Sequence, residues 1–339
     1  MSKKLAYVVM TALVLSLAGN ALAQIGPAGW WAEHIGDGVP GSVSVSGTTY
    51  TVIGDGHDIW DNSDGFQYMY KQLTGDGSMT ARVVSIGPGS NTWAKAGVMI
   101  RQNNTGPSQH AMTVITRNSD GGAGNGASFQ QRVTNAAGGT NSDSGSVVAA
   151  PYWARIVRTG NSFTGFISPN GTTWTQLGSA TTVTMTDPVL IGLCATSHAA
   201  GELVTMTFDN VSFTGNVTDR PPQMKAWNPD PPVGAIGVST PLFQWKPGET
   251  ALFHNVYFGT TPPLTDADLM ATRQPFAMYF HIPGLQPGTT YYWRVDEIDA
   301  VGTVTTGDVW SFATEPVKNY LPVPADAAAG QLPGLVLSW

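Results

Sequence analysis

The chain has 339 residues, with 16 Lys and Arg against 23 Asp and Glu, and its formal net charge at pH 7 is −7. This acidic balance argues against nucleic acid or an anionic membrane surface as the partner. Only 12% of the residues are charged, whereas Gly (40) and Pro (23) are abundant, a composition typical of short strands joined by turns. We therefore expect an all-β protein.

Residues 1–23 have the pattern of a secretory signal peptide. Two lysines open the chain, an apolar run covers residues 5–19, and the triplet Ala21-Leu22-Ala23 precedes Gln24. We expect cleavage after Ala23 and a secreted, extracellular or cell-surface protein without membrane insertion. A membrane anchor is the less favoured alternative, because the apolar run is short and leads into a cleavage-type triplet.

Residues 24–217 contain strand-like runs separated by glycine-rich breaks. The runs are YTVIG, FQYMYKQL, MTARVVSIG, AGVMIR, HAMTVITR, SFQQRV, YWARIVRTG, SFTGFIS, VLIGLCATS and LVTMTFDNVSF. Their number and spacing predict an antiparallel two-sheet jelly-roll sandwich. We expect Asn170-Gly171 to form a tight hairpin turn and residues 118–128 and 135–146 to form loops.

Cys194 is the only cysteine, so a disulfide within the chain is impossible. It lies in the apolar run VLIGLCATS. We expect it to be a small residue of the core rather than a reactive thiol.

A proline-rich stretch at 218–222 marks a domain boundary, and residues 222–316 have the length of an immunoglobulin-like sandwich. The segment GLQPGTTYYWRV has the spacing Leu-x-Pro-x-Thr-x-Tyr, which ends at Tyr291, and resembles the fibronectin type III family. This resemblance implies that Tyr291 forms a structural corner through a hydrogen bond to the backbone. Residues 317–339 repeat the opening of this module, so we expect the truncated start of a further fibronectin type III-like repeat and a fragment of a longer product.

Five motifs of the first domain occur in a characteristic order. They are DIWDNSDGFQYMYKQLTGDGSMTARV, NTWAKAGVMIRQ, APYWARIVRTGNSFTGFISPNGTTWTQLG, IGLCATSH and TFDNVSF. Together they resemble the concanavalin A-like lectin/glucanase superfamily, in the branch labelled regulation-of-enolase-like, over residues 33–213. The resemblance implies a jelly roll, whereas its function is open because this superfamily includes lectins, carbohydrate-binding modules and glycosidases.

The acidic residues do not form the pair that glycosidases use for catalysis. The runs MTARVVSIG, AGVMIRQ, HAMTVITR and SFQQRV contain no Asp or Glu. Asp296, Glu297 and Asp299 fall in the second module, where we expect an exposed strand and loop. His110 and His198 could act as bases, but without a partner motif we interpret both as hydrogen-bonded structural residues, and we expect no catalytic residue and no required cofactor.

The stretch TWAKAGVMIRQ alternates with a period of two. Its small apolar residues are expected to face the core, which turns Trp93, Lys95 and Arg101 outward. With neighbouring strands, the candidate ligand-binding residues are Trp93, Lys95, Arg101, His110, Gln130 and Arg132. An aromatic plate surrounded by long hydrogen-bond donors is a common way to hold a sugar. In the alternative interpretation, Trp93 covers a sheet edge and the cations lie along apolar surface.

A structural calcium ion is a further hypothesis. Asp209 is the candidate ligand on the last strand, and Asp37 or Glu33 with loop carbonyls could complete the oxygen set. The alternative is that Asp209 caps a strand end. The segment DIWDNSDGF is interpreted as a turn, because its aspartates lack EF-hand spacing.

These patterns favour a secreted, noncatalytic module that binds extracellular polysaccharide or glycan. Two alternatives remain open at this stage. One is a structural or adhesive surface protein that binds other proteins. The other is the accessory region of a carbohydrate-active enzyme whose catalytic domain lies beyond residue 339.

Overall fold

The computed structural model describes residues 24–89, 91–117, 126–143 and 148–316. In these segments the chain forms strands β1 to β23 and one 3-10 helix, Asp266–Asp268, so the all-β prediction is confirmed. The expected signal peptide and the expected further repeat lie outside the described residues. The chain divides into two compact units, Met1–Pro221 and Pro222–Trp339. No helix in the described segments is long and apolar enough to cross a membrane.

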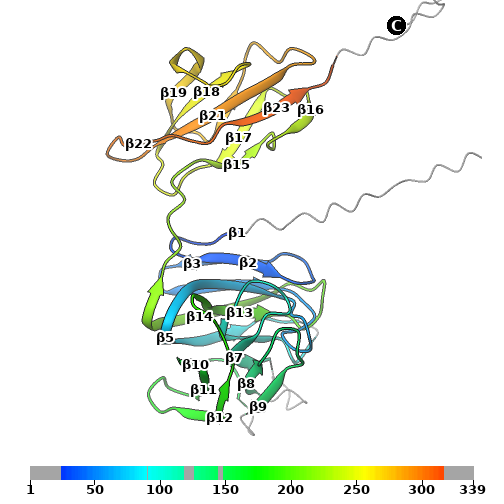
Figure 1. The fold of residues 1–339 in the computed structure, drawn as a ribbon, viewed down its shortest axis with the longest axis vertical. Helices are drawn as coiled ribbons and strands as arrows, with labels where there is room; N and C mark the ends of the chain where they lie inside the picture. The colour runs from blue at the N-terminus through cyan, green and yellow to red at the C-terminus, as the bar shows by residue number, and fades with distance from the viewer. Residues whose placement is uncertain (1–23, 90, 118–125, 144–147, 317–339) are drawn as a thin grey trace, which may run out of the picture. The chain divides into compact units, whose positions relative to one another are not determined.

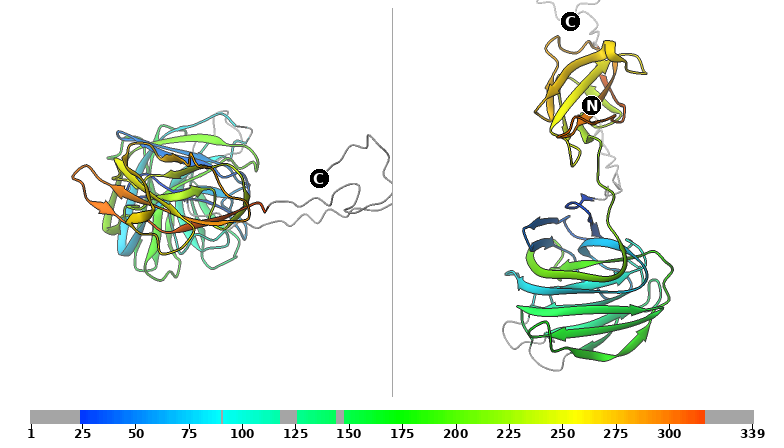
Figure 2. Two further views of the ribbon diagram at one scale, coloured as in Figure 1. Left: turned by 90° about the horizontal axis from the view of Figure 1, so that it is seen from above. Right: turned by 90° about the vertical axis from the view of Figure 1, so that its left-hand side faces the viewer.

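The first unit is a sandwich of two antiparallel sheets that share the long strand β5 (Phe66–Ile86), as predicted (Figures 1 and 2). Sheet A contains the first half of β5 with β1 (Gln24–Ile25), β2 (Trp31–Ile35), β13 (Val189–Thr196), β6 (Lys95–Arg101), β7 (His110–Thr116), β8 (Ala127–Arg132) and β9 (Thr140–Asp143). Sheet B contains the second half of β5 with β3 (Ser42–Ser46), β4 (Thr49–Gly54), β14 (Val204–Thr218), β10 (Tyr152–Thr159), β11 (Ser162–Ser168) and β12 (Thr175–Thr182).

Strand β5 passes from one sheet to the other without a break. Its residues 67–73 pair with β13 in sheet A, and its residues 77–83 pair with β10 in sheet B. Gly75 lies between these two segments with φ +77°, a conformation that glycine adopts at little cost. The two runs that the sequence presents as separate strands are therefore one strand that bends.

The core between the sheets consists of small and branched apolar side chains. Ala96, Val98 and Ile100 of β6 are fully buried there, as the alternation predicts. Thr113 Oγ1 of sheet A donates to the Arg155 carbonyl of sheet B at 3.0 Å, which links the layers directly. Because successive side chains point to opposite faces of a strand, these inward-facing residues also determine which side chains lie on the other face of sheet A.

The opposite face of sheet A is buried as well, which corrects the expectation that its polar side chains point to solvent. Every residue of β6, β7 and β8 is buried, and Lys95 and Arg101 are only 1% and 0% exposed. A second apolar cluster covers this face and includes Ile59, Tyr68 and Cys194. Burial raises the pKa of the Cys194 thiol to about 12, which fits the predicted core role.

Two local predictions in the first unit are wrong. Strand β9 forms inside the segment interpreted as a loop, because it pairs with β8 at the edge of sheet A. The turn between β11 and β12 covers residues 169–174 rather than the tight turn expected at residues 169–171, and Gly171 has positive φ (+76°) whereas Asn170 does not. The Asn170 Oδ1 atom caps this wider turn by accepting the backbone N–H groups of Thr172 and Thr173, both at 2.9 Å.

The second unit is also a two-sheet β-sandwich. One sheet contains β15 (Trp227–Asp230), β17 (Leu242–Lys246) and β20 (Met278–Phe280). The other contains β16 (Ala235–Val238), β23 (Trp310–Thr314), β21 (Thr290–Ile298), β18 (Phe253–Gly259), β19 (Leu269–Gln274) and β22 (Val304–Thr305). The Gln286 backbone N–H donates to the Tyr291 hydroxyl at 2.9 Å, the type of contact that the Tyr291 spacing implies.

The acidic cluster of the second unit differs from its prediction. Asp296 and Glu297 are buried, at 4% and 2% exposure, rather than on an exposed strand. Each has a cationic or imidazole partner, because Arg294 Nε lies 2.7 Å from Asp296 and His254 Nδ1 lies 2.5 Å from Glu297. The cluster is therefore a pair of satisfied internal contacts.

Candidate functional site

The loop of residues 55–65 lies over the second face of sheet A and builds one wall of the candidate site. Thr196 Oγ1 donates to the carbonyl groups of Gly56 and Gly65 at 3.2 and 2.9 Å. Gly56 has φ +129°, and a Cβ atom there would lie 1.9 Å from the Gly65 carbonyl oxygen. The close approach of the two loop ends therefore requires glycine at position 56.

A buried ion cluster anchors the same loop. Asp64, which is 0% exposed, contacts Arg132 Nη2 at 2.5 Å and Arg101 Nη1 at 3.2 Å. Arg132 also donates to the carbonyl groups of Trp60 and Asp61 on the loop. Two buried guanidinium groups with one carboxylate need such carbonyl acceptors, because an unpaired buried charge is costly.

This cluster corrects half of the predicted ligand set. Arg101, Arg132 and His110 share one face of sheet A, but each is at most 1% exposed, and none lines the pocket described below. Burial, together with the charges of the two arginines, lowers the pKa of His110 to about 4, although Asp64 acts in the opposite direction. His110 is therefore a neutral internal residue at neutral pH.

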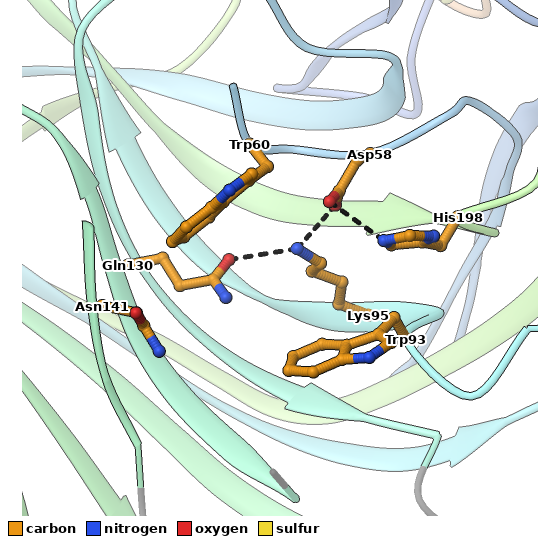
Figure 3. A pocket seen from close by; sticks show the side chains of 7 residues that line it. All are labelled: Asp58, Trp60, Trp93, Lys95, Gln130, Asn141 and His198. Carbon is orange, nitrogen blue, oxygen red and sulfur yellow. Dashed lines mark hydrogen bonds and ion pairs between the residues drawn. The ribbon is translucent and has the colours of Figure 1, made fainter. Parts of the chain in front are cut away.

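A pocket of about 350 Å³ opens beside the cluster (Figure 3). Trp93, Lys95 and Gln130 are the three members of the predicted set that the structure brings together there. Among the described residues, the lining is Asp58, Trp60, Trp93, Lys95, Gln130, Asn141 and His198. It draws on the loop of residues 55–65, on β6, β8 and β9, and on the end of β13, so residues far apart in the sequence meet at one edge of sheet A.

The floor of the pocket is a chain of polar contacts centred on Lys95 (Figure 3). Its Nζ atom lies 2.5 Å from Asp58 Oδ1 and donates to Gln130 Oε1 at 3.2 Å. His198 Nε2 lies 3.0 Å from the other oxygen of Asp58. Burial acts to raise the pKa of Asp58, but the His198 hydrogen bond and the Lys95 charge outweigh it and hold this pKa below its ordinary value.

Two tryptophans form the aromatic part of the lining. Both indole rings are partly exposed, and their centroids lie 5.9 Å (Trp60) and 6.0 Å (Trp93) from Lys95 Nζ. Figure 3 shows the rings on opposite sides of the ammonium group. Asn91 sets the approach to β6, because its Oδ1 atom accepts the Trp93 backbone N–H at 2.9 Å. The pocket thus combines apolar ring surface with amide, carboxylate and imidazole groups.

Sequence reasoning did not identify four lining residues: Asp58, Trp60, Asn141 and His198. The segment DIWDNSDGF is interpreted as a turn in the sequence, and a single tryptophan between aspartates is too common on protein surfaces to mark a site. His198 is a non-glycine residue with φ +58°, a conformation that cannot be inferred from its neighbours. It does have the predicted hydrogen-bonded role, but its partner lies in the pocket.

The two candidate calcium ligands have separate partners. Arg82 Nε donates to Asp209 Oδ1 at 2.7 Å, and His57 Nδ1 lies 2.5 Å from Asp37 Oδ1. Across the described segments, no three His, Cys, Asp or Glu side chains are grouped as a metal site. Calcium binding stays a prediction, and the Arg82 cation already neutralises the Asp209 carboxylate. If calcium does bind there, chelation will lower the melting temperature and Asp209→Ala will remove that effect.

No protein-family model and no curated protein matches this chain. Among solved structures, a functionally unknown protein from Saccharomyces cerevisiae is similar at 21% identity and TM-score 0.41, over 52% of this chain and 92% of that chain. A lectin from Bauhinia forficata in complex with GalNAc is similar at 12% identity and TM-score 0.36, over 58% and 96%. A xylan beta-1,4-xylosidase from Bacillus halodurans C-125 is similar at 9% identity and TM-score 0.35, over 49% and 32%. Such distant likenesses do not transfer a function, so the pocket itself must supply the evidence.

Proposed function

We propose that the first unit is a noncatalytic carbohydrate-binding module of a secreted protein, and that the pocket beside Lys95 is its sugar site. The observation that carries this proposal is the pairing of two indole rings with polar groups in one pocket. The C–H faces of a sugar ring pack on aromatic surface, while its hydroxyl groups need hydrogen-bond partners of both kinds. Trp60 and Trp93 offer the first contact, and Asp58, Gln130 and Asn141 offer the second.

The lining favours binding over hydrolysis. Glycoside hydrolysis ordinarily uses two carboxyl groups that flank the scissile bond. Asp58 is the one carboxylate among the described residues that line the pocket, and Lys95 and His198 already contact both of its oxygens. A group held in this way is suited to receiving hydroxyl hydrogens.

The test is binding of a panel of soluble and insoluble polysaccharides, measured by affinity electrophoresis and pull-down. Trp60→Ala and Trp93→Ala should each weaken binding by about 2 kcal/mol or more, because truncated aromatic anchors are typical hot spots. Trp174→Ala is the matched control, since Trp174 is partly exposed, stacks on Arg155 at 3.7 Å and does not line the pocket. Well-folded Trp93→Ala protein that binds every glycan as tightly as the parent would contradict the proposal.

A protein-binding role is the second candidate, and one feature of the second unit favours it. Phe276, Met278 and Phe280, which lie in or next to the edge strand β20, are 68%, 44% and 55% exposed. Exposed apolar side chains beside an unpaired strand edge are typical of an interaction surface. This candidate would be favoured if the protein binds no glycan and if the double variant Phe276→Ser, Phe280→Ser loses surface adhesion.

A further inference from the structure

The hydrogen-bonding capacity of Lys95 is fully used inside the protein. An ammonium group has three hydrogens. Lys95 Nζ has three acceptors around it: Asp58 Oδ1 at 2.5 Å, Gln130 Oε1 at 3.2 Å and the Ile59 carbonyl at 3.5 Å. The side chain is also only 1% exposed. Lys95, the one lysine among the described residues of the lining, is therefore not available to pair with an anionic ligand.

The orientation of the Gln130 amide follows from the same contact. An ammonium group can only donate, so it must face the Oε1 atom and not the amide nitrogen. The Nε2 atom, which has no partner among the described residues, is then free to donate. Gln130 accordingly offers a ligand a donor, which suits a hydroxyl or ring oxygen.

Asp58 offers the complementary acceptor. A carboxylate has about four lone-pair positions. Lys95 and the Ile59 backbone N–H (2.6 Å) occupy two on Oδ1, and His198 occupies one on Oδ2. The side chain remains 15% exposed at the pocket. The remaining position on Oδ2 can accept a hydroxyl hydrogen, whereas a carboxylate or sulfate on a ligand has no hydrogen to donate to it.

We propose that this pocket selects uncharged sugars and excludes glycans that carry carboxylate or sulfate groups, with Lys95 acting as a positioning residue for Asp58 and Gln130. This inference rests on the proposed sugar site and adds its ligand class. Lys95 and Asp58 form a neutral pair, and His198 directs its Nε2 atom to the same carboxylate, so the lysine and imidazole nitrogens that face Asp58 are not directed at a ligand. This differs from the role first assigned to Lys95, which was direct contact with a sugar.

The experiment compares glycans that share a backbone and differ in charge, at pH 8 and moderate salt. The pairs are mannan with polymannuronate, and hydroxyethyl cellulose with carboxymethyl cellulose. In each pair that binds, the neutral member should bind at least tenfold more tightly. Anionic members that bind equally or more tightly would overturn the inference alone. Binding of no member would overturn the proposed function and, with it, this inference.

The Asp58→Asn variant provides a second test, in which the preference should shift toward anionic glycans. The substitution keeps the shape of the side chain but leaves Lys95 without its counter-charge. The ratio of the affinities for the neutral and anionic members of a pair should therefore shift at least tenfold toward the anionic member. Asp61→Asn is the matched control, because it removes the same formal charge from an exposed position of the same loop. An unchanged ratio in folded Asp58→Asn protein would contradict the role of the pair. If that variant does not fold, the parent ratios decide the matter by themselves.

Discussion

His110 is only 1% exposed, and its Nδ1 atom lies 3.6 Å from an oxygen of Asp64. Its pKa of about 4 in the folded protein is below the ordinary value of 6.5, mainly because burial disfavours the charged ring. The unfolded chain therefore binds more protons between about pH 6.5 and pH 4, and protonation favours unfolding. Stability that is present above pH 6.5 should be lost as the pH falls toward 4, by about 3 kcal/mol in total.

Thermal melts of the first unit from pH 7 to pH 4 test this expectation, with His110→Gln as the variant. The variant should lose less stability than the parent over this interval. His57→Gln is the control of opposite sign. Burial acts to lower the pKa of His57, but the hydrogen bond and charge of Asp37 outweigh it, so this pKa lies above its ordinary value. That variant should become more sensitive to acid, and an unchanged slope in His110→Gln would show that other groups control the loss.

Tyr291 gives a prediction for the second unit. Its hydroxyl accepts the Gln286 N–H at 2.9 Å, so Tyr291→Phe should lower the free energy of unfolding by about 1 kcal/mol. Denaturant titration measures this change. Tyr292→Phe is the control, because the Tyr292 hydroxyl has no partner within the described segments. Equal losses in both variants would mean that the corner contact contributes nothing specific.

At the scale of elements, the loop of residues 55–65 depends on the buried cluster beneath it. Asp64→Asn removes the only carboxylate that contacts both Arg101 and Arg132 among the described residues. Breaking a buried ion pair on one side leaves a charge uncompensated, so the first unit should lose about 3–5 kcal/mol of stability. Urea titration of Asp64→Asn against Asp61→Asn isolates the buried contact, since Asp61 is exposed on the same loop. Near-equal midpoints would show that the loop does not depend on this contact.

Both faces of sheet A are buried. Its core face packs on sheet B, and its second face carries the loop and the ion cluster. Along β6, Ala96, Val98 and Ile100 alternate with a set that includes Lys95 and Arg101, a pattern usual for a sheet with one solvated face. The polar side chains are instead paired with one another and with loop carbonyls, which makes their burial tolerable.

At the scale of the whole molecule, the division at Pro221 predicts two independent folding units. Residues 24–221 and residues 222–316, expressed separately, should each unfold cooperatively, because each has its own apolar core. Calorimetry of the two fragments should reproduce the transitions of the longer chain. A fragment that melts without a cooperative transition would place the boundary elsewhere.

Local pattern was enough to predict the all-β class, most strands of the first unit and the face shared by Lys95, Gln130 and Arg132. Period-two alternation depends only on near neighbours, and the register of adjacent strands preserves it. The backbone contact of Tyr291 was an expectation from the family that its segment resembles, and its partner Gln286 lies only five residues away.

Only the tertiary structure decided which polar residues form the pocket and which are internal. Lys95 and Arg101 have the same character in the sequence, yet one lines the pocket and the other is enclosed with Asp64. The difference arises from the loop of residues 55–65, which contributes Asp58 to one site and Asp64 to the other. Where a loop lies on a sheet depends on contacts between residues distant in sequence, and such contacts leave no periodic signal along the chain.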